Sequence, residues 1–160
     1  MVKKSARKVK KAVAHKEMRP RMGRATTHEL AALVIRFALG IVFVAHGAMK
    51  LFSVGVVGVG QFMGSLGVPA PFAAGVLISV LEFGGGLLLI LGLFTRWAAL
   101  LFAIEMFFAW VLVHAQNGFF ITPGAYGYEF VLTLLLVSIG VFFHGAGLFS
   151  LEKAVFGHEL

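Results

Sequence analysis

The chain of 160 residues is too apolar and too poor in charge to be an ordinary soluble domain. Apolar residues make up 59% of it and charged residues 13%, whereas soluble domains are close to half apolar and about a quarter charged. The composition therefore indicates an integral membrane protein. The absence of cysteine excludes disulfides, Cys-ligated iron–sulfur clusters and covalently attached c-type haem within this chain.

The positive charge is concentrated at the N-terminus. Ten of the 14 Lys and Arg residues lie in residues 1–29 together with two Glu, so this segment carries +8 and the rest of the chain carries −1, which gives the total of +7. Basic residues near a membrane surface bind anionic lipid with about 1 kcal/mol each. We therefore interpret residues 1–28 as a basic cytoplasmic tail that contacts anionic lipids, with no nucleic acid as partner; an organellar transit peptide is the alternative.

Four apolar runs follow, each long enough to cross about 30 Å of hydrocarbon as a helix that rises about 1.5 Å per residue. None of them alternates apolar and polar residues as the strands of a membrane barrel do. The sequence thus predicts an all-α fold, an integral membrane four-helix bundle over residues 29–152, followed by a short tail at 153–160. The helices are predicted at about residues 29–52, 72–94, 97–115 and 128–147.

The links between these runs differ in length and charge. Thr95-Arg96 is so short that the second and third helices must be antiparallel neighbours. Residues 53–70 are rich in glycine and could form a short amphipathic segment at the surface, and residues 116–127 resemble an ordered loop; neither contains a charged residue. Because the tail, Arg96 and Lys153 fall on the other side and positive residues are retained in the cytoplasm, we predict a multi-pass protein of the plasma (inner) membrane with both termini cytoplasmic.

Two short matches within the chain suggest a duplication. Phe43-Val-Ala-His46 resembles Val111-Leu-Val-His114, and Gly92-Leu-Phe-Thr95 resembles Gly147-Leu-Phe-Ser150. A two-helix parallel repeat would explain both. Chance matches between apolar segments are the alternative.

Ionisable residues inside the predicted helices are costly in a membrane and therefore indicate function. Counting along the helices places Arg36, Glu82 and Glu105 in an inner-to-central layer. We expect Arg36 to pair with Glu105 or Glu82, since an unpaired charge at that depth is unfavourable; a purely structural pair is the alternative. Two carboxyl groups for one arginine leave one Glu able to carry a proton. The candidate catalytic residues are Glu82, Glu105 and Arg36.

A second polar set is predicted nearer the outer surface. It combines donors, acceptors and aromatic rings that could hold a quinone head group through its carbonyl oxygens, or else form a polar cap that holds the loops down. Two histidines at similar depth would also allow haem or a metal ion, but no ligand-spacing motif favours either. The candidate cofactor-binding residues are His46, Lys50, His114, Asn117, Tyr128 and Glu129.

Five segments carry a family pattern. They begin at Arg36, Phe62, Glu82, His114 and Gly127 and read RFALGIVFVAHGAMKLF, FMGSLGVP, EFGGGLLLILGLFTR, HAQNGF and GYE. Taken in order, from about residue 30 to 151, they resemble the DoxX family of small bacterial and archaeal membrane proteins. The residues that match this pattern are Arg36, His46, Gly47, Lys50, Glu82, Arg96, His114, Asn117, Gly118 and Glu129.

The resemblance implies a four-helix membrane protein associated with redox chemistry. Family members resemble membrane subunits of thiosulfate:quinone oxidoreductase, partners in oxidant-defence complexes, or proteins linked to quinone and catechol stress. Our leading hypothesis is a quinone-linked membrane subunit of an oxidoreductase complex that works with a cofactor-bearing partner subunit. The alternatives are a non-catalytic membrane anchor or assembly protein and a small-molecule or ion transporter, which would require a homo-oligomer.

Overall fold

The computed structural model describes residues 27–159, and these residues form an all-helical protein. The prediction of a basic tail at residues 1–28 lies outside this range except for its last two residues. Within the range, an isolated antiparallel bridge between Thr122 and Ala125 is the β structure present. The α-helices are α2 (Thr27–Ala48), α3 (Gly55–Ser65), α4 (Pro71–Val80), α5 (Gly86–Leu91), α6 (Thr95–Ala109), α7 (Glu129–His144) and α8 (Leu151–Phe156).

Short segments of other helix types join several of these helices. Three are π-helices: η1 (Met49–Val54), η2 (Leu81–Gly85) and η3 (Trp110–His114). The fourth is the 3₁₀-helix η4 (Ala115–Asn117). Helical segments therefore follow one another directly over Thr27–Ser65, Pro71–Leu91 and Thr95–Asn117, and the first of these stretches turns back at Gly55.

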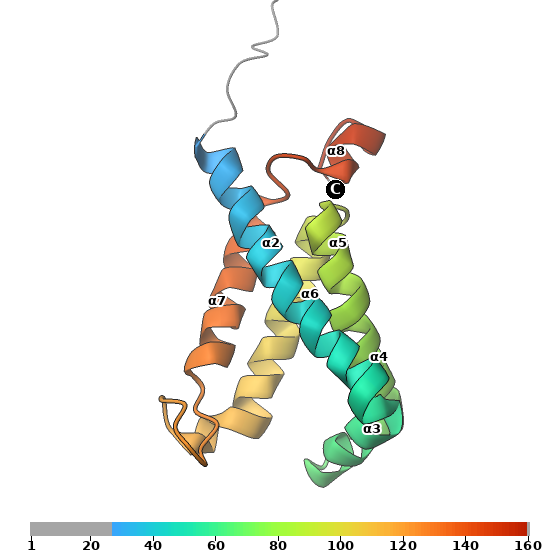
Figure 1. Ribbon diagram of the computed structural model, residues 1–160, viewed down its shortest axis with the longest axis vertical. Helices are drawn as coiled ribbons and strands as arrows, with labels where there is room; N and C mark the ends of the chain where they lie inside the picture. Colours follow the sequence, from blue (N-terminus) through green and yellow to red (C-terminus); the bar gives the residue numbers. More distant parts are fainter. Residues whose placement is uncertain (1–26, 160) are drawn as a thin grey trace, which may run out of the picture.

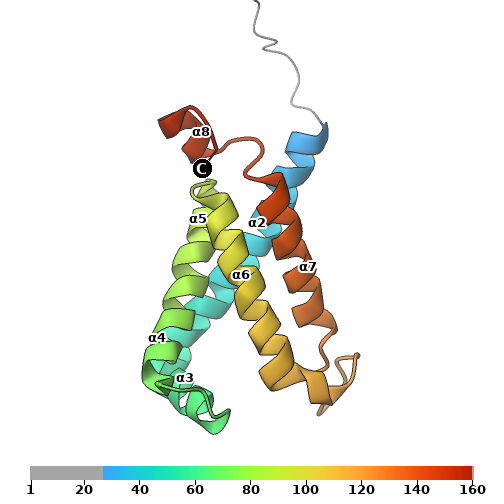
Figure 2. The same ribbon diagram turned by 180° about the vertical axis from the view of Figure 1, so that it is seen from behind.

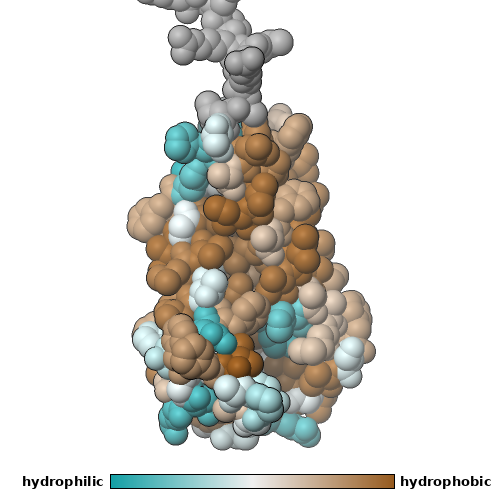
Figure 3. All heavy atoms as spheres, turned by 60° about the vertical axis from the view of Figure 1, so that its left-hand side comes forward, coloured by the Kyte–Doolittle hydropathy of each residue, from teal (hydrophilic) through white to brown (hydrophobic). Residues whose placement is uncertain are grey.

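These three stretches are long and apolar enough to cross a membrane, and α7 is a shorter apolar helix of 16 residues. Large apolar side chains are exposed along them, as expected where a surface faces lipid instead of water. In Figure 3 they form a broad brown area, with most of the hydrophilic atoms toward the two ends of the molecule. The predicted helical membrane protein is thus supported, and the side of the membrane on which the termini lie stays a prediction.

The helices lie close together at one end and separate toward the other (Figures 1 and 2). We call the end that holds α8 and the start of α2 the terminal end. The opposite end, which holds α3 and residues 118–128, is the loop end. Helix α2 crosses α5 and η2, α7 packs along α6, and α3 folds back on α4. Two arms, α2 with α4 and α6 with α7, therefore diverge toward the loop end.

Glycine sets how closely α2 approaches the second membrane span. A Cβ atom built on Gly47 would lie 2.2 Å from the backbone nitrogen of Phe83, and one built on Gly86 would lie 2.9 Å from the carbonyl oxygen of Gly40. Only residues without side chains allow two helix backbones to come this close. Of the three glycines that follow Glu82, Gly86 makes this backbone contact with α2.

The apolar core lies between α2, α5, α6 and α7, above the point where the arms diverge. Its centre is a stacked pair of aromatic rings, Phe43 and Phe102, whose centroids are 3.6 Å apart. Leu39, Leu89 and Ala99 are almost completely buried around this pair. The tightest packing of the molecule is thus nearer to the terminal end than to the loop end.

Part of the link at residues 53–70 forms helix α3, which packs on α4 and does not lie only at the surface. Gly55 has φ +74°, a conformation that glycine adopts without steric cost, and the chain turns back there. Helix α3 then packs on α4, so that a Cβ atom built on Gly75 would lie 2.7 Å from the backbone nitrogen of Gly60. The glycines of this link therefore serve helix contact within the loop end.

The two Gly-Leu-Phe turns of the proposed repeat share a backbone conformation. Gly92 and Gly147 have φ +67° and +68°, and Phe94 and Phe149 both have φ +49°. Each turn precedes a helix, α6 or α8. The similarity of the two motifs thus extends to their local structure, while a duplicated two-helix unit stays a prediction.

Candidate functional site

An ion pair lies inside the bundle between Lys50 and Glu82. The Lys50 Nζ donates to Glu82 Oε2, and the Glu82 side chain is 4% exposed while that of Lys50 is 21% exposed. Each residue belongs to a π-helical segment, η1 or η2. Such segments interrupt the regular hydrogen-bond pattern of a helix and are frequent at functional sites.

A second carboxyl group, that of Glu105 on α6, lies beside this pair. It interacts with both Glu82 and Lys50, and its Oε2 is buried without a hydrogen-bond partner. We call Lys50, Glu82 and Glu105 the lysine–glutamate cluster. With one ammonium and two carboxyl groups, the cluster is electrically neutral when it holds one additional proton, and a net buried charge is costly. The arrangement can therefore store and transfer a proton.

The expected pairing of Arg36 with Glu82 or Glu105 is wrong. Arg36 is completely buried, and its Nη2 donates to the carbonyl oxygens of Leu148 (3.2 Å) and Phe149 (3.4 Å). Lys50, which was expected in the outer set, pairs with Glu82 instead. The residue count assumed helices that start at one level, but α2 crosses the second span at Gly47, which brings Lys50 and not Arg36 next to Glu82.

Arg36 instead helps to close the terminal end. A Cβ atom built on Gly92 would lie 1.8 Å from Arg36 Nη1, so the guanidinium occupies the space that a side chain would take there. The chain that returns after α7 covers this place, because Ser150 Oγ and the Glu152 backbone N–H both donate to the Gly92 carbonyl oxygen, at 2.9 and 3.0 Å. The contacts of Arg36 are therefore architectural.

Arg96 stabilises the C-terminal end of α7. Its Nη1 donates to the carbonyl oxygens of Phe142 (2.9 Å) and Phe143 (3.0 Å), and its Nη2 lies 3.3 Å from Glu159 Oε2. The last carbonyl groups of a helix have no partner within the helix, and a basic side chain supplies one. Arg96 thus ties α6, α7 and the C-terminal segment together.

Acidification is expected to loosen the C-terminal segment through Glu159. Burial alone would raise the pKa of this carboxyl group, but Lys153, whose Nζ is 2.8 Å from Oε1, and Arg96 together hold it below its ordinary value of 4.5. Since the folded-state pKa is the lower one, this stabilisation is complete above the ordinary value and is lost as the pH falls through the lowered value. A fluorophore on Val155→Cys would report the transition, which Glu159→Gln should abolish; an unchanged acid transition in that variant would contradict the assignment.

Three of the predicted cofactor-binding residues hold the loop before α7. His114 Nδ1 lies 2.9 Å from the Tyr126 carbonyl oxygen, and Asn117 Nδ2 donates to the same oxygen at 3.3 Å. The Glu129 carboxylate accepts from the Ile121 backbone N–H at 2.8 Å. This geometry agrees with the alternative of a polar cap that holds the loop down.

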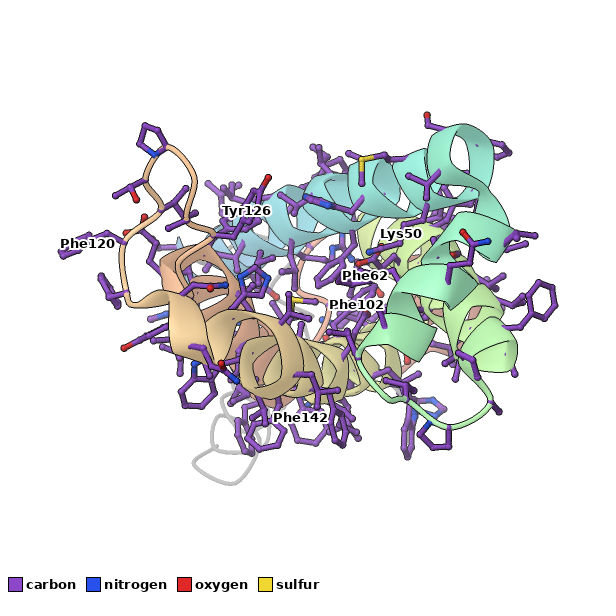
Figure 4. The ribbon with its side chains drawn as sticks, turned by 90° about the horizontal axis from the view of Figure 1, so that it is seen from below. Lys50, Phe62, Phe102, Phe120, Tyr126 and Phe142 are labelled. Atoms are coloured by element: carbon purple, nitrogen blue, oxygen red, sulfur yellow. The ribbon has the colours of Figure 1, made fainter. Side chains whose placement is uncertain are left out.

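The remaining members of the predicted outer set lie apart. The ring of Tyr128 packs against Phe119, with centroids 5.4 Å apart, and the exposed His46 lies on α2 with its ring 6.3 Å from that of Phe130. Figure 4, viewed from the loop end, shows Lys50 toward the middle of the molecule and Tyr126 with the loop at one side. The outer set therefore divides into a loop group, His46 on α2, and Lys50, which joins the lysine–glutamate cluster.

Comparison with known proteins identifies the family. The DoxX family pattern matches residues 31–115. A protein of Haemophilus influenzae named "Uncharacterized protein" is 35% identical over 123 residues, which cover 76% of this chain and 88% of that protein. The Bacillus subtilis protein named "Putative oxidoreductase CatD" is 34% identical over 128 residues, 80% of this chain and 89% of that protein.

A further relative is named as an inner membrane protein. The Escherichia coli protein named "Inner membrane protein YphA" is 39% identical over 70 residues, 44% of this chain and 49% of that protein. No solved structure matches the chain. The family match over residues 31–115 and the two relatives that are 35% and 34% identical over most of their length show that the chain belongs to the DoxX family.

Proposed function

We propose that the protein is the quinone-linked membrane subunit of an oxidoreductase complex and that the lysine–glutamate cluster binds the quinone head group. The observation that carries this proposal is the cluster itself, because three ionisable side chains meet inside an apolar bundle where two helices are π-helical. The family and the name of the relative CatD support the redox class.

The cluster offers the groups that quinone reduction requires. A quinone carbonyl oxygen accepts hydrogen bonds, which the Lys50 ammonium can donate, and reduction to the quinol takes two electrons and two protons, one proton for each oxygen. General acids must lie within hydrogen-bond reach of the reacting oxygen. The one proton that Glu82 and Glu105 share can supply the first of the two protons and, once it is replaced from water, the second. Arg36 has no part in this chemistry, because it lies with the carbonyl groups of the terminal end.

The electrons come from a partner subunit that carries the redox cofactor. The chain has no cysteine to hold an iron–sulfur cluster or to attach haem covalently, which leaves a bound cofactor or a partner protein as the electron donor, and the proposal takes the partner. Extraction in a mild detergent would keep such a complex together. A chain that co-purifies with no redox protein would instead favour the membrane anchor or the transporter.

Quinone binding is expected to weaken about tenfold or more in Glu82→Gln and in Glu105→Gln, because each substitution removes a carboxyl group that orients the Lys50 ammonium, and a hydrogen bond from that charged group to the quinone contributes about 1.5–3 kcal/mol. The purified protein in detergent is titrated with a short-chain benzoquinone and a naphthoquinone, and quenching of the intrinsic Trp fluorescence gives the dissociation constant. Folding should persist in Glu82→Gln, since Glu105 still balances the charge of Lys50.

Glu129→Gln is the matched control. It removes a carboxylate of the loop, where the amide oxygen can still accept from Ile121, and it should leave quinone binding unchanged. Equal affinity in the wild-type protein and both cluster variants would exclude the cluster as the quinone site.

A further inference from the structure

We propose that the lysine–glutamate cluster opens to the loop end alone, because the stacked rings of Phe43 and Phe102 close the bundle on its terminal side. This inference rests on the proposed function in treating the cluster as the binding site. It adds the route by which the head group and its protons reach the cluster. It also assigns a role to Phe43 and Phe102, which close the bundle on the opposite side.

The aromatic pair is completely enclosed. Phe43 is 1% and Phe102 0% exposed, and their rings are nearly parallel, with an interplanar angle of 5°. The Phe102 ring also lies directly on the second span, since a Cβ atom built on Gly85 would be 2.9 Å from its Cζ atom. The two rings and the backbone of Gly85 come from three helices and pack directly against one another, so that both rings are shielded from water.

Both rings lie between the cluster and the terminal end. Helix α2 starts at the terminal end, and along the continuous helix Phe43 precedes Lys50 by seven residues, or about 10 Å at about 1.5 Å per residue. Helix α6 also starts there, and Phe102 precedes Glu105 by nearly one turn. The layer is completed by Leu39, Leu89 and Ala99, which are almost completely buried.

A second closed layer lies further toward the terminal end. Arg36 is completely buried there beneath the carbonyl oxygens of Leu148 and Phe149, and its guanidinium contacts Gly92. A proton or a polar head group moving from this side would have to pass a fixed positive charge and then the aromatic pair. Both layers therefore oppose access from the terminal end.

Side chains of α2 and η1 on the loop-end side of the aromatic pair are exposed by contrast. The Lys50 side chain keeps 21% of its surface exposed although its partner Glu82 is buried, and His46, about one turn earlier on α2, is exposed beside Phe130 of α7. Figure 4 shows Lys50 and Phe102 toward the middle of the view from below. Access from the loop end thus leads directly to the ammonium group.

Thiol labelling tests this route, because the chain has no cysteine and a single introduced one is labelled alone. His46→Cys and Lys50→Cys are placed in sealed vesicles of both orientations and treated with a membrane-impermeant cationic methanethiosulfonate. Phe120→Cys marks the loop end, and Val155→Cys marks the terminal end. We expect both site cysteines to be labelled only in the vesicles in which Phe120→Cys is labelled.

The aromatic pair is tested by adding Phe102→Ala to His46→Cys. Labelling in vesicles of both orientations should then require Arg36→Ala as well, because both layers oppose access from the terminal end. Leu101→Ala, which shortens an exposed neighbour on the same helix, should leave labelling one-sided in the same background. The inference would be overturned if, with Phe102 intact, the site cysteines were labelled in the vesicles in which Val155→Cys is labelled. It would also be overturned if they were labelled in neither kind of vesicle. Since labelling needs no quinone, one-sided labelling in a protein that binds no quinone would support the route and contradict the proposed function.

Discussion

Substitution of Lys50 by Met is expected to destabilise the protein by about 3–5 kcal/mol, because removing one partner of a buried ion pair leaves the other charge uncompensated. Lys50 is the cation that the structure places next to both Glu82 and Glu105. Reversible unfolding in mixed micelles of mild detergent and dodecyl sulfate measures the change in free energy. Adding Glu82→Gln should restore most of the loss, since it removes the charge that Lys50→Met leaves behind.

Lys153→Met provides the matched control for this prediction. Lys153 also pairs with a glutamate, Glu159, but its side chain is 42% exposed. Exposed ion pairs contribute about 0–1 kcal/mol because water screens them, and this variant should unfold almost as the wild-type protein does. Similar small losses for Lys50→Met and Lys153→Met would show that the Lys50–Glu82 pair is not shielded from water.

The membrane spans could be predicted from the sequence because a single physical requirement determines their structure. A backbone inside lipid must satisfy its own hydrogen bonds, so a long apolar run has to be a helix. A short link was likewise predicted to make antiparallel neighbours, but at Thr95-Arg96; the turn lies at residues 92–94 instead, and Thr95 and Arg96 are the first residues of α6. The positions of the apolar runs in the sequence therefore predicted most of the helices.

The pairing of charges could not be predicted from depth along each helix. Counting treats every helix as straight and as starting at one level, whereas α2 crosses the second span and continues into the π-helical segment that holds Lys50. A signal was present, however, in Gly47. A glycine that allows close backbone contact with Phe83 places Lys50, about one turn further on, opposite Glu82.

The outer set was predicted as one site because its residues are polar and a residue count placed them at a similar depth. Three of the six bind the loop backbone itself, as His114 and Asn117 show by sharing the carbonyl oxygen of Tyr126. Residue type alone does not distinguish a side chain that waits for a ligand from one that stabilises its own loop. Lys50 differs because its partner comes from another membrane span.

Substitution of Gly47 by Ala is expected to cost at least about 3 kcal/mol, at or beyond the upper end of the usual 1–3 kcal/mol for overpacking. The added Cβ atom would meet the backbone of Phe83 at 2.2 and 2.7 Å and that of Glu82 at 2.8 Å. Backbone atoms cannot rotate away as a side chain can, so α2 and the second span must separate. The same separation would pull Lys50 from Glu82, and the loss should show in the mixed-micelle unfolding experiment.

Gly84→Ala separates this effect from the general consequence of replacing a glycine in a helix. Gly84 lies in the same span as Phe83, but a Cβ atom built on it meets nothing within 4 Å. Alanine favours a helix over glycine by about 1 kcal/mol, so this variant should be as stable as the wild-type protein or slightly more stable. If Gly47→Ala were tolerated equally well, the close crossing could not be what holds Lys50 against Glu82, and the lysine–glutamate cluster would need another cause.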